Sequence, residues 1–414
     1  MTRFLYTALL YALLPLVPLR LLWRARRQRE YLRHIPERFG FYRAARSARH
    51  VIWIHAVSVG ETRAAEPLVR ALRSRYPRHR ILLTHMTPTG RETGEQLFGA
   101  TVERCYLPYD YPGAVRRFLD RFEPVAGVLM ETELWPNLIH AAASRRIPVY
   151  LVNARLSEKS YAGYERHRRL AGAALEALAA VAAQTQADAQ RLAALGARTL
   201  RVTGNLKFDI VPPPAMMQLG QRWREAYGAR PVLLAASTRA GEEELVLDAF
   251  ERMAIANALL VIVPRHPDRF EEVAALLQRR GHAYQRRSDD RPVAAQTRVV
   301  LGDSLGEMFA YYAACDVAFI GGSLLPYGSQ NLIEACAVGK PVLIGPSTFN
   351  FAEAAQLAIE GGAALSVADV EELARAARQL MTDPAAAARM GEAGLAFCRA
   401  HQGAVHRVLE LVRF

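Results

Sequence analysis

Three carboxylates in the first half of the chain directly follow apolar runs, where an acid or base could act on a ligand. Glu61 lies in HAVSVGETRAAE, between the apolar run VIWI and the helical pattern PLVRALRSRY. Glu131 and Glu133 follow VAGVLM in the same manner. Residues two apart on an extended backbone face the same side, so we expect these two side chains to point together. A carboxylate so placed can take the proton of a hydroxyl group.

Glu61 has a second interpretation, because acidic residues are common in the first turn of a helix. A strand, a Ser-Val-Gly turn and a helix are predicted here, with Glu61 in the first turn of that helix. The helix dipole would lower the pKa of the carboxyl group, whereas a partly dry site would raise it. The sequence leaves open which of the two effects is larger.

The second half of the chain carries cations and glycines at places that also follow apolar runs. The run LVIVPRHP ends in Pro264 and Arg265, and a guanidinium suits a phosphate because it donates two parallel hydrogen bonds. GDSLGEM contains a turn at Leu305-Gly306-Glu307, and AASTRAGEEE reads as a strand, a loop and a helix start. Glycines let a backbone approach a ligand closely, so a nucleotide-binding crevice is expected in this half.

The run VAFIGGSLLPYGSQNLIEA adds a glycine turn and a short helix that begins near Asn331. Glu334 in that helix is placed to accept hydrogen bonds from a ribose diol, and helix N-termini favour phosphate. Lys207, in GNLKFD, lies where the two halves of the chain join and could stabilise a leaving phosphate. GxGxxG, Walker and DxD motifs are absent, and no cysteine pair has metal-ligand spacing.

The elements that position these residues are short apolar runs alternating with helical patterns, the rhythm of a doubly wound parallel sheet. With 414 residues, the chain suits two such domains. Pro212 to Pro214 form a stiff connector and a plausible boundary. The predicted strands are VIWIHAV, ILLTHM, VAGVLME, PVYLVNA and AVAAQT in the first half and PVLLAAST, LLVIVPRH, RVVLGD, VAFIGGS and PVLIGP in the second.

The net charge of +13 is concentrated at the N-terminus, where residues 1–50 carry eleven arginines and two glutamates. This basic block follows the apolar segment from Phe4 to Trp23, whereas a nucleic-acid binder would spread its basic surface over a folded domain. Since most of the charge follows the apolar core, a cytoplasmic-side membrane anchor is favoured over a signal peptide. A buried core helix remains the alternative, and Arg24, Arg26 and Arg27 would contact anionic lipid.

Many blocks of the chain resemble, in order, the signature blocks of the 3-deoxy-D-manno-octulosonic acid (Kdo) transferases. The resemblance covers nearly the whole chain and implies a GT-B fold, two Rossmann-like domains facing across a cleft, with an N-terminal membrane-anchor helix. One departure is Ser329, where the family usually has glycine. The matching blocks are HAVSVGET, THMTPTGRE, YLPYD, METELWPN, NARLS, GNLKFD, VPRHP, GGSL, NLIEA and GPSTFNF.

The resemblance also implies an activity, inverting transfer of Kdo from CMP-Kdo to the lipid A precursor lipid IVA at the cytoplasmic face of the inner membrane. It implies a membrane anchor at residues 1–35, an acceptor-binding domain at 36–211 and a CMP-Kdo-binding domain at 212–414. Neither a metal nor another cofactor is expected. The residues that match functional positions are Glu61 as the base, Glu131 as a second acid, and Pro264, Arg265, Leu305, Gly306, Glu307, Asn331, Leu332, Ile333 and Glu334 as CMP contacts.

Two alternatives stay open at this point. Another two-domain sugar-nucleotide enzyme, a different glycosyltransferase or a UDP-sugar epimerase, would share the strand pattern. A membrane-tethered nucleotide-binding scaffold without catalysis would also share it, although Glu61 and Glu131 are then unexplained. Arg38 and Arg91 are further candidates, for contact with acceptor phosphates.

Overall fold

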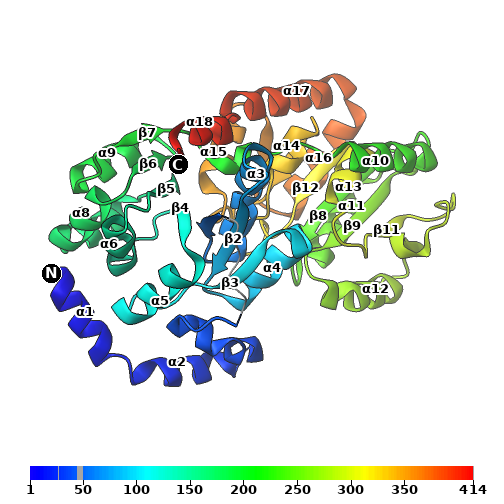
Figure 1. Ribbon diagram of the computed structural model, residues 1–414. Coiled ribbons are helices and arrows are strands. Elements are labelled where there is room, and N and C mark those ends of the chain that lie inside the picture. The colour runs from blue at the N-terminus through cyan, green and yellow to red at the C-terminus, as the bar shows by residue number, and fades with distance from the viewer. Residues whose placement is uncertain (27, 44–49, 414) are drawn as a thin grey trace. The chain divides into compact units, whose positions relative to one another are not determined.

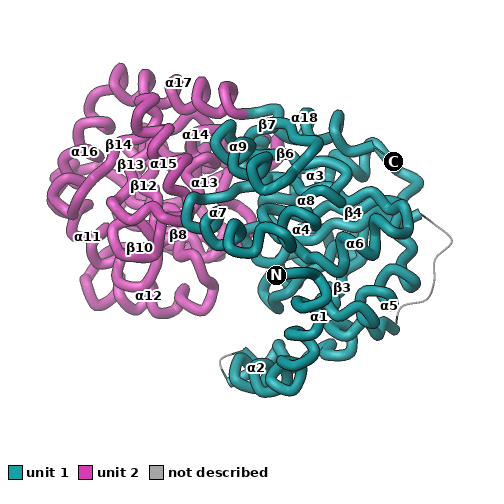
Figure 2. The backbone as a smooth tube through the Cα atoms, turned by 90° about the vertical axis from the view of Figure 1, so that its left-hand side faces the viewer, with its two compact units in different colours: residues 1–209, 402–414 teal, residues 210–401 magenta. Residues whose placement is uncertain are grey.

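The computed structural model of the protein describes residues 1–26, 28–43 and 50–413, so Arg27 lies outside the described residues. The chain divides into two compact units (Figure 2). Unit 1 comprises residues 1–209 and 402–414, and unit 2 comprises residues 210–401. Each unit contains one seven-stranded sheet, and all the strand pairings are parallel.

The sheet of unit 1 has the order β3-β2-β1-β4-β5-β6-β7. After β1, the next two strands in the chain, β2 and β3, add to one side of β1, and β4 then pairs with the other side. The strand order therefore reverses between β1 and β4, and ligands of open parallel sheets bind at such a reversal. Its strands are β1 (Val51–His55), β2 (Arg80–His85), β3 (Glu103–Tyr106), β4 (Pro124–Met130), β5 (Val149–Ala154), β6 (Ala180–Ala183) and β7 (Leu200–Val202).

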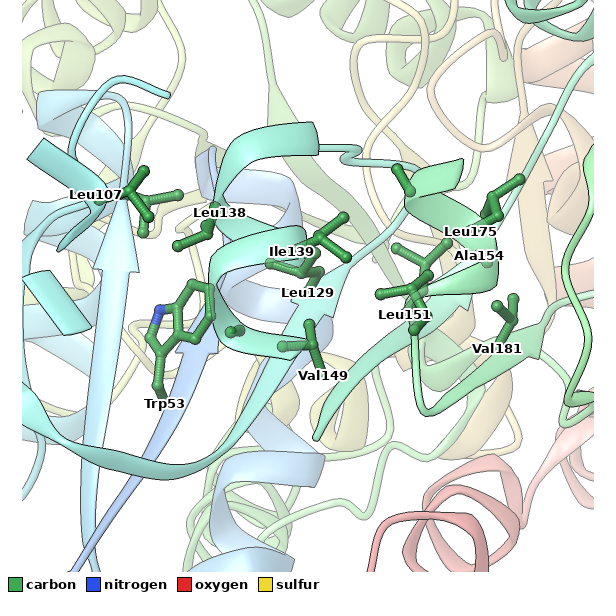
Figure 3. Close-up of a cluster of buried hydrophobic side chains, with 14 of the residues drawn as sticks. Trp53, Leu107, Leu129, Leu138, Ile139, Val149, Leu151, Ala154, Leu175 and Val181 are labelled. Carbon is green, nitrogen blue, oxygen red and sulfur yellow. The ribbon is translucent and has the colours of Figure 1, made fainter. Parts of the chain in front are cut away.

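Both faces of this sheet are buried, which explains why its central strands are almost wholly apolar. Trp53, Leu129 and Leu151 point into the cluster drawn in Figure 3, whereas their neighbours in the chain point into a second cluster on the opposite face. The helices and 3₁₀ turns of unit 1 are α1 (Arg3–Ala12), α2 (Leu16–Ala25), η1 (Arg29–Leu32), η2 (Ile35–Phe39), α3 (Val59–Arg75), α4 (Pro88–Phe98), η3 (Gly99–Thr101), α5 (Pro112–Phe122), α6 (Pro136–Ser144), α7 (Glu158–Glu165), α8 (Arg168–Glu176), α9 (Gln186–Leu195), η4 (Leu206–Phe208) and α18 (Ala404–Leu411) (Figure 1).

Unit 2 repeats the plan, with the order β10-β11-β9-β8-β12-β13-β14 and a reversal between β8 and β12. Its strands are β8 (Val232–Thr238), β9 (Leu259–Pro264), β10 (Tyr284–Arg286), β11 (Val299–Leu301), β12 (Val317–Ile320), β13 (Val342–Ile344) and β14 (Ala364–Ser366). Its helices and 3₁₀ turns are α10 (Pro214–Tyr227), α11 (Glu242–Met253), η5 (Pro267–Arg269), α12 (Phe270–Arg279), η6 (Arg287–Asp289), α13 (Met308–Ala314), α14 (Ile333–Ala337), α15 (Ala352–Glu360), α16 (Val370–Thr382) and α17 (Pro384–His401).

The C-terminal end of the chain differs from the expected range 212–414, because residues 402–414 belong to unit 1. Ala404, Val408 and Val412 are buried in the cluster of unit 1 that also contains α3. The carboxylate of Asp209 accepts hydrogen bonds from the N–H groups of Gly403 (2.6 Å) and Val405 (2.5 Å) at the start of α18. The proline run is also not a free connector, since Pro214 is the first residue of α10.

The expected anchor consists of two helices, α1 and α2, that are bent by 63° relative to each other. Within the described residues, no single helix is long and apolar enough to cross a bilayer, although the bent pair passes a test of length and composition. Residues 1–35 are part of unit 1 rather than a separate unit.

Candidate functional site

Glu61 lies in the first turn of α3, beside the reversal between β1 and β4 in unit 1. Its carboxylate accepts hydrogen bonds from the N–H of Val57 (2.8 Å) and the hydroxyl of Ser58 (2.9 Å). Only 8% of the residue is exposed. The helix-start interpretation is therefore correct as geometry, and it places a buried carboxylate at the ligand-binding edge of the sheet.

Burial is the largest influence on this carboxyl group and raises the pKa of Glu61 to about 7. The Val57 hydrogen bond opposes the rise, while the negative charges of Glu131 and Glu133 add to it. The question left open by the sequence is thus answered, since desolvation outweighs the stabilisation at the helix start. A carboxylate with a pKa near 7 is a more effective general base at neutral pH than an ordinary one.

Glu131 follows β4, the strand on the other side of the reversal, so the structure brings it together with Glu61. The extended backbone that we expected for Glu131 and Glu133 is wrong, because Glu131 has a left-handed conformation with φ of +57°. Its N–H donates to the carbonyl of Val152 (2.8 Å). Burial raises the pKa of Glu133, and the charge of Glu131 raises it further.

Two arginines proposed for acceptor phosphates have protein partners instead. Arg38 is only 1% exposed, and its guanidinium lies 3.9 Å from the centre of the Tyr106 ring. Arg91 forms an ion pair of 2.6 Å with Glu37. Neither residue is presented at the surface as an unpaired cation.

Pro264 and Arg265 lie at the end of β9 in unit 2, as the sequence predicts. The backbone N–H of Arg265 donates to the carbonyl of Thr238 (3.0 Å), which ties the ends of β8 and β9 together. The Arg265 side chain donates to the amide oxygen of Gln330 (3.2 Å). These contacts hold the guanidinium at the edge of the sheet where ligands bind.

The turn at Leu305-Gly306-Glu307 follows β11 and leads into α13. Leu305 is 66% exposed, and Gly306 has a left-handed φ of +79°. Glu307 is paired with Arg287 at 3.2 Å. An exposed apolar side chain beside a left-handed glycine is available for contact with a ligand.

Only two of the four residues from Asn331 to Glu334 can offer a side chain. The amide of Asn331 donates to Glu334 (3.1 Å), which fixes both groups at the start of α14. Leu332 and Ile333 are buried, so a ligand could reach them only through the backbone. Lys207 belongs to unit 1 and lies in η4.

The glycine turn after β12 is bound to a side chain of the protein. Glu242, at the start of α11, accepts hydrogen bonds from the N–H groups of Gly322 (2.5 Å), Ser323 (2.9 Å) and Leu324 (3.0 Å). It also accepts the N–H of Arg239 (2.9 Å). The N–H groups of this turn are therefore occupied by a carboxylate of the protein itself.

The AASTRAGEEE block was expected to form a strand, a loop and a helix start, and this expectation did not single out Glu242 or Arg239. A signal was available, because Gly241-Glu242 repeats the Gly60-Glu61 pair at the start of the helix after the first strand of each unit. Ser329, the departure from the resembled family, is buried with a left-handed φ of +69°, a conformation that favours glycine.

Unit 1 contains a cavity of about 1100 Å³ that is separate from the candidate site, since neither Glu61 nor Glu131 lines it. Its lining is basic and includes Arg70, Arg73, Arg80, Arg91 and Arg104, with His34 from the N-terminal segment. Across the described ranges, no group of three His, Cys, Asp or Glu side chains could hold a metal ion.

Comparisons with known proteins agree with the sequence blocks. A family model described as 3-deoxy-D-manno-octulosonic-acid transferase matches residues 33–210, and one for glycosyl transferases group 1 matches residues 241–397. The 3-deoxy-D-manno-octulosonic acid transferase of Bordetella pertussis is 47% identical over 99% of this chain and 98% of its own length. The enzyme of Haemophilus influenzae is 37% identical over 100% of this chain and 98% of its own.

Solved structures show the fold. UDP-GlcNAc 2-epimerase from Neisseria meningitidis has a TM-score of 0.58 at 16% identity, over 87% of this chain and 99% of its own. A glycosyltransferase from Rickettsia africae has a TM-score of 0.57 at 13% identity, over 88% and 98%. Two Rossmann-like units with a glycosyltransferase model on the second make this a GT-B fold.

Proposed function

The chain belongs to the Kdo transferase family, and we propose that it transfers Kdo from CMP-Kdo to lipid IVA with inversion at the anomeric carbon. It is a glycosyltransferase of lipopolysaccharide core biosynthesis, and the epimerase and scaffold alternatives are not favoured. The observation that carries the mechanism is Glu61, a buried carboxylate with a pKa raised to about 7.

In the proposed step, Glu61 takes the proton of the acceptor hydroxyl as its oxygen bonds to the anomeric carbon of Kdo. The bond from that carbon to the phosphate oxygen breaks, and CMP leaves with the electron pair. Burial raises the pKa of Glu61, and the charge of Glu131 adds to the rise. Arg265 and Lys207 are the proposed cations for the negative charge on the leaving phosphate.

The scheme needs no metal or other cofactor, because a base and two cations account for the movement of proton and charge. Transfer should therefore persist in excess EDTA. Loss of activity in EDTA and its return with a divalent cation would contradict this part of the proposal.

Replacing Glu61 by glutamine tests the base. Glu61→Gln keeps the shape of the side chain but cannot accept a proton, so kcat should fall by about 100-fold or more. Inhibition by CMP should be unchanged. Glu66→Gln is the matched control, because Glu66 lies on the same helix and only pairs with Arg70 near the surface. Wild-type turnover in Glu61→Gln would show that Glu61 is only a helix-start residue. Separately, mass spectrometry of the lipid product of the wild-type enzyme would give the number of Kdo residues added.

For the membrane, we propose that α1 and α2 lie in the cytoplasmic interface of the inner membrane rather than across it. One side of α1 contacts the rest of unit 1, since Thr7 donates to Asn137 (3.1 Å) and Tyr111 donates to the carbonyl of Leu10 (3.1 Å). Tyr6 also donates to the buried carboxylate of Asp110. A helix that spans the bilayer would be surrounded by lipid. The polar contacts of α1 with a folded domain are not compatible with that environment.

The other side of these helices is apolar. Nine of the seventeen exposed large apolar side chains among the described residues lie between Phe4 and Trp23. Arg20 lies among them and Arg24 and Arg26 follow them in the chain, a composition typical of a helix that lies on anionic lipid.

Cysteine labelling distinguishes the two arrangements. All four native cysteines are buried, so one cysteine inserted after Met1 would be the reactive thiol. A membrane-impermeant maleimide should label it only after the inner membrane is permeabilised. Labelling from the periplasm, in cells whose inner membrane is intact, would show that the segment spans the bilayer.

A further inference from the structure

The N–H groups of the glycine turn in unit 2 already have acceptors within the protein. A phosphate at such a turn is normally held by backbone N–H groups. Here the carboxylate of Glu242 already accepts the N–H groups of Gly322, Ser323 and Leu324, and the N–H of Gly321 donates to Ala236. A negatively charged ligand at this edge would therefore be bound by side chains rather than by the N–H groups of this turn.

Arg239 directly follows β8 and lies at the reversal between β8 and β12, where ligands of this fold bind. A Cβ atom added to Gly322 would lie 3.4 Å from the Cγ of Arg239, so the side chain passes across the glycine turn. Two groups hold its guanidinium, which donates to Nε2 of His266 (2.8 Å) and lies 4.8 Å from the centre of the Tyr327 ring.

Neither of these partners neutralises the charge of Arg239. Burial and the nearby charges of Arg239 and Arg265 lower the pKa of His266, so its ring is neutral and accepts the hydrogen bond. Among the ion pairs of the described residues, none joins Arg239 to a carboxylate. Arg269, whose charge also lowers the pKa of His266, differs because it is paired with the buried carboxylate of Glu243.

The donor of the proposed reaction carries two negative groups, the phosphate of CMP and the carboxylate of Kdo. The guanidinium of Arg239 is half-buried at this edge of unit 2, and its side chain donates to a neutral group, the ring of His266. Arg265 belongs to the block that resembles the CMP contacts. A neutral sugar would leave Arg239 without a counter-charge, whereas a sugar acid supplies one.

We propose that Arg239 binds the carboxylate of the Kdo moiety and so selects a sugar acid at the donor site. A guanidinium suits this task because it forms two parallel hydrogen bonds with a carboxylate. His266 and Tyr327 are positioning residues that fix the plane of the guanidinium. The inference rests on the proposed function, since it names the sugar group that the donor site recognises.

Steady-state kinetics of the full-length enzyme tests this assignment, with CMP-Kdo as donor and CMP as inhibitor. CMP contains the nucleotide and the phosphate but not the carboxylate. Arg239→Gln should raise the KM for CMP-Kdo by about 10- to 100-fold, the loss of a charged hydrogen-bond pair, and leave the Ki of CMP unchanged. Unchanged CMP inhibition also shows that unit 2 is folded.

Three further variants complete the design. Arg265→Gln should raise both constants, and Arg286→Gln, which removes an arginine paired with the exposed Glu271, should change neither. Arg239→Lys should have an intermediate KM, because lysine keeps the charge and loses the paired hydrogen bonds.

Two outcomes would overturn the proposal. Equal increases of the KM for CMP-Kdo and the Ki of CMP in Arg239→Gln would assign Arg239 to the phosphate. No change in either constant would remove Arg239 from the donor site. Failure of the proposed function is separate, since the wild-type enzyme would then not transfer Kdo at all.

Discussion

At the scale of single residues, the two units place a Gly-Glu pair at the same point and use it differently. Glu242 accepts four backbone N–H groups and is completely buried, so it holds a loop in place. Glu61 accepts two hydrogen bonds and has two carboxylates as neighbours, which leaves it able to exchange a proton. The sequence pattern is shared, and the number of donors around each carboxylate separates the two roles.

The raised pKa of Glu61 predicts the pH dependence of the reaction. The base must be ionised, and protonation below its pKa removes it, so kcat/KM should fall as the pH drops below about 7. An ordinary glutamate would keep its activity to about pH 4.5. The pH profile of kcat/KM is the measurement.

Glu131→Gln is the informative companion variant. Because the charge of Glu131 raises the pKa of Glu61, its removal should move the acidic limb of the profile to lower pH, whatever it does to kcat. A limb that stays in place would mean that the titrating group is not Glu61.

Ser329 predicts a second residue-level effect. Its left-handed backbone costs about 1 kcal/mol for a residue with a side chain, and glycine avoids this cost at the expense of a more flexible unfolded chain. Ser329→Gly should therefore raise the free energy of unfolding by roughly 0.5 kcal/mol and keep Kdo transfer.

Ser74→Gly, in the last turn of α3, is the matched control and should lower stability, because glycine is unfavourable in a helix. Denaturant titration of both variants gives the comparison. If Ser329→Gly is less stable than the wild type, the hydrogen bond from the Ser329 hydroxyl to the carbonyl of Gln330 (2.9 Å) matters more than the backbone.

At the scale of elements, the sequence predicted the five central strands of each sheet and missed all four edge strands. The missed strands are β3 and β7 in unit 1 and β10 and β14 in unit 2. Each of these strands has three or four residues, and several of the residues are exposed or half-buried, for example Arg201, Tyr284 and Leu365. A strand with a neighbour on only one side buries less apolar surface, so its sequence lacks the apolar run that marks a central strand.

The C-terminal helix α18 yields a prediction about Asp209, which lies in the GNLKFD block. Its carboxylate accepts two N–H groups at the start of α18, so Asp209→Ala should destabilise unit 1 by about 1 kcal/mol. Asp369→Ala, which removes the cap of α16 in unit 2, should have a similar effect on unit 2 alone. Hydrogen exchange of the two units is the measurement, and protection lost equally in both units by Asp209→Ala would contradict the assignment.

At the scale of the whole molecule, the chain crosses between units twice, near Asp209 and near Gln402. The polypeptide 210–401 contains a complete sheet and core, so it should fold alone and bind CMP. Residues 1–209 alone expose the cluster that Ala404, Val408 and Val412 cover, and should be sensitive to protease.

A joined polypeptide provides the control for this prediction. Asp209 contacts Gly403, so a short glycine-serine linker can connect residue 209 to residue 402. The joined polypeptide, tested in detergent because of its apolar N-terminal helices, should regain protease resistance. If it is as sensitive as residues 1–209, the C-terminal segment does not complete the core of unit 1.

The sequence by itself determined the class of fold, the family and most of the candidate residues, because those depend on local apolar periodicity and on blocks of adjacent residues. Tertiary structure alone decided three matters that depend on distant partners. Burial raises the pKa of Glu61, Glu242 fills the glycine turn after β12 with a carboxylate, and residues 402–414 return to unit 1. Desolvation, hydrogen bonds between separate strands and the return of a chain end have no local signature, since each arises from residues far apart in the sequence.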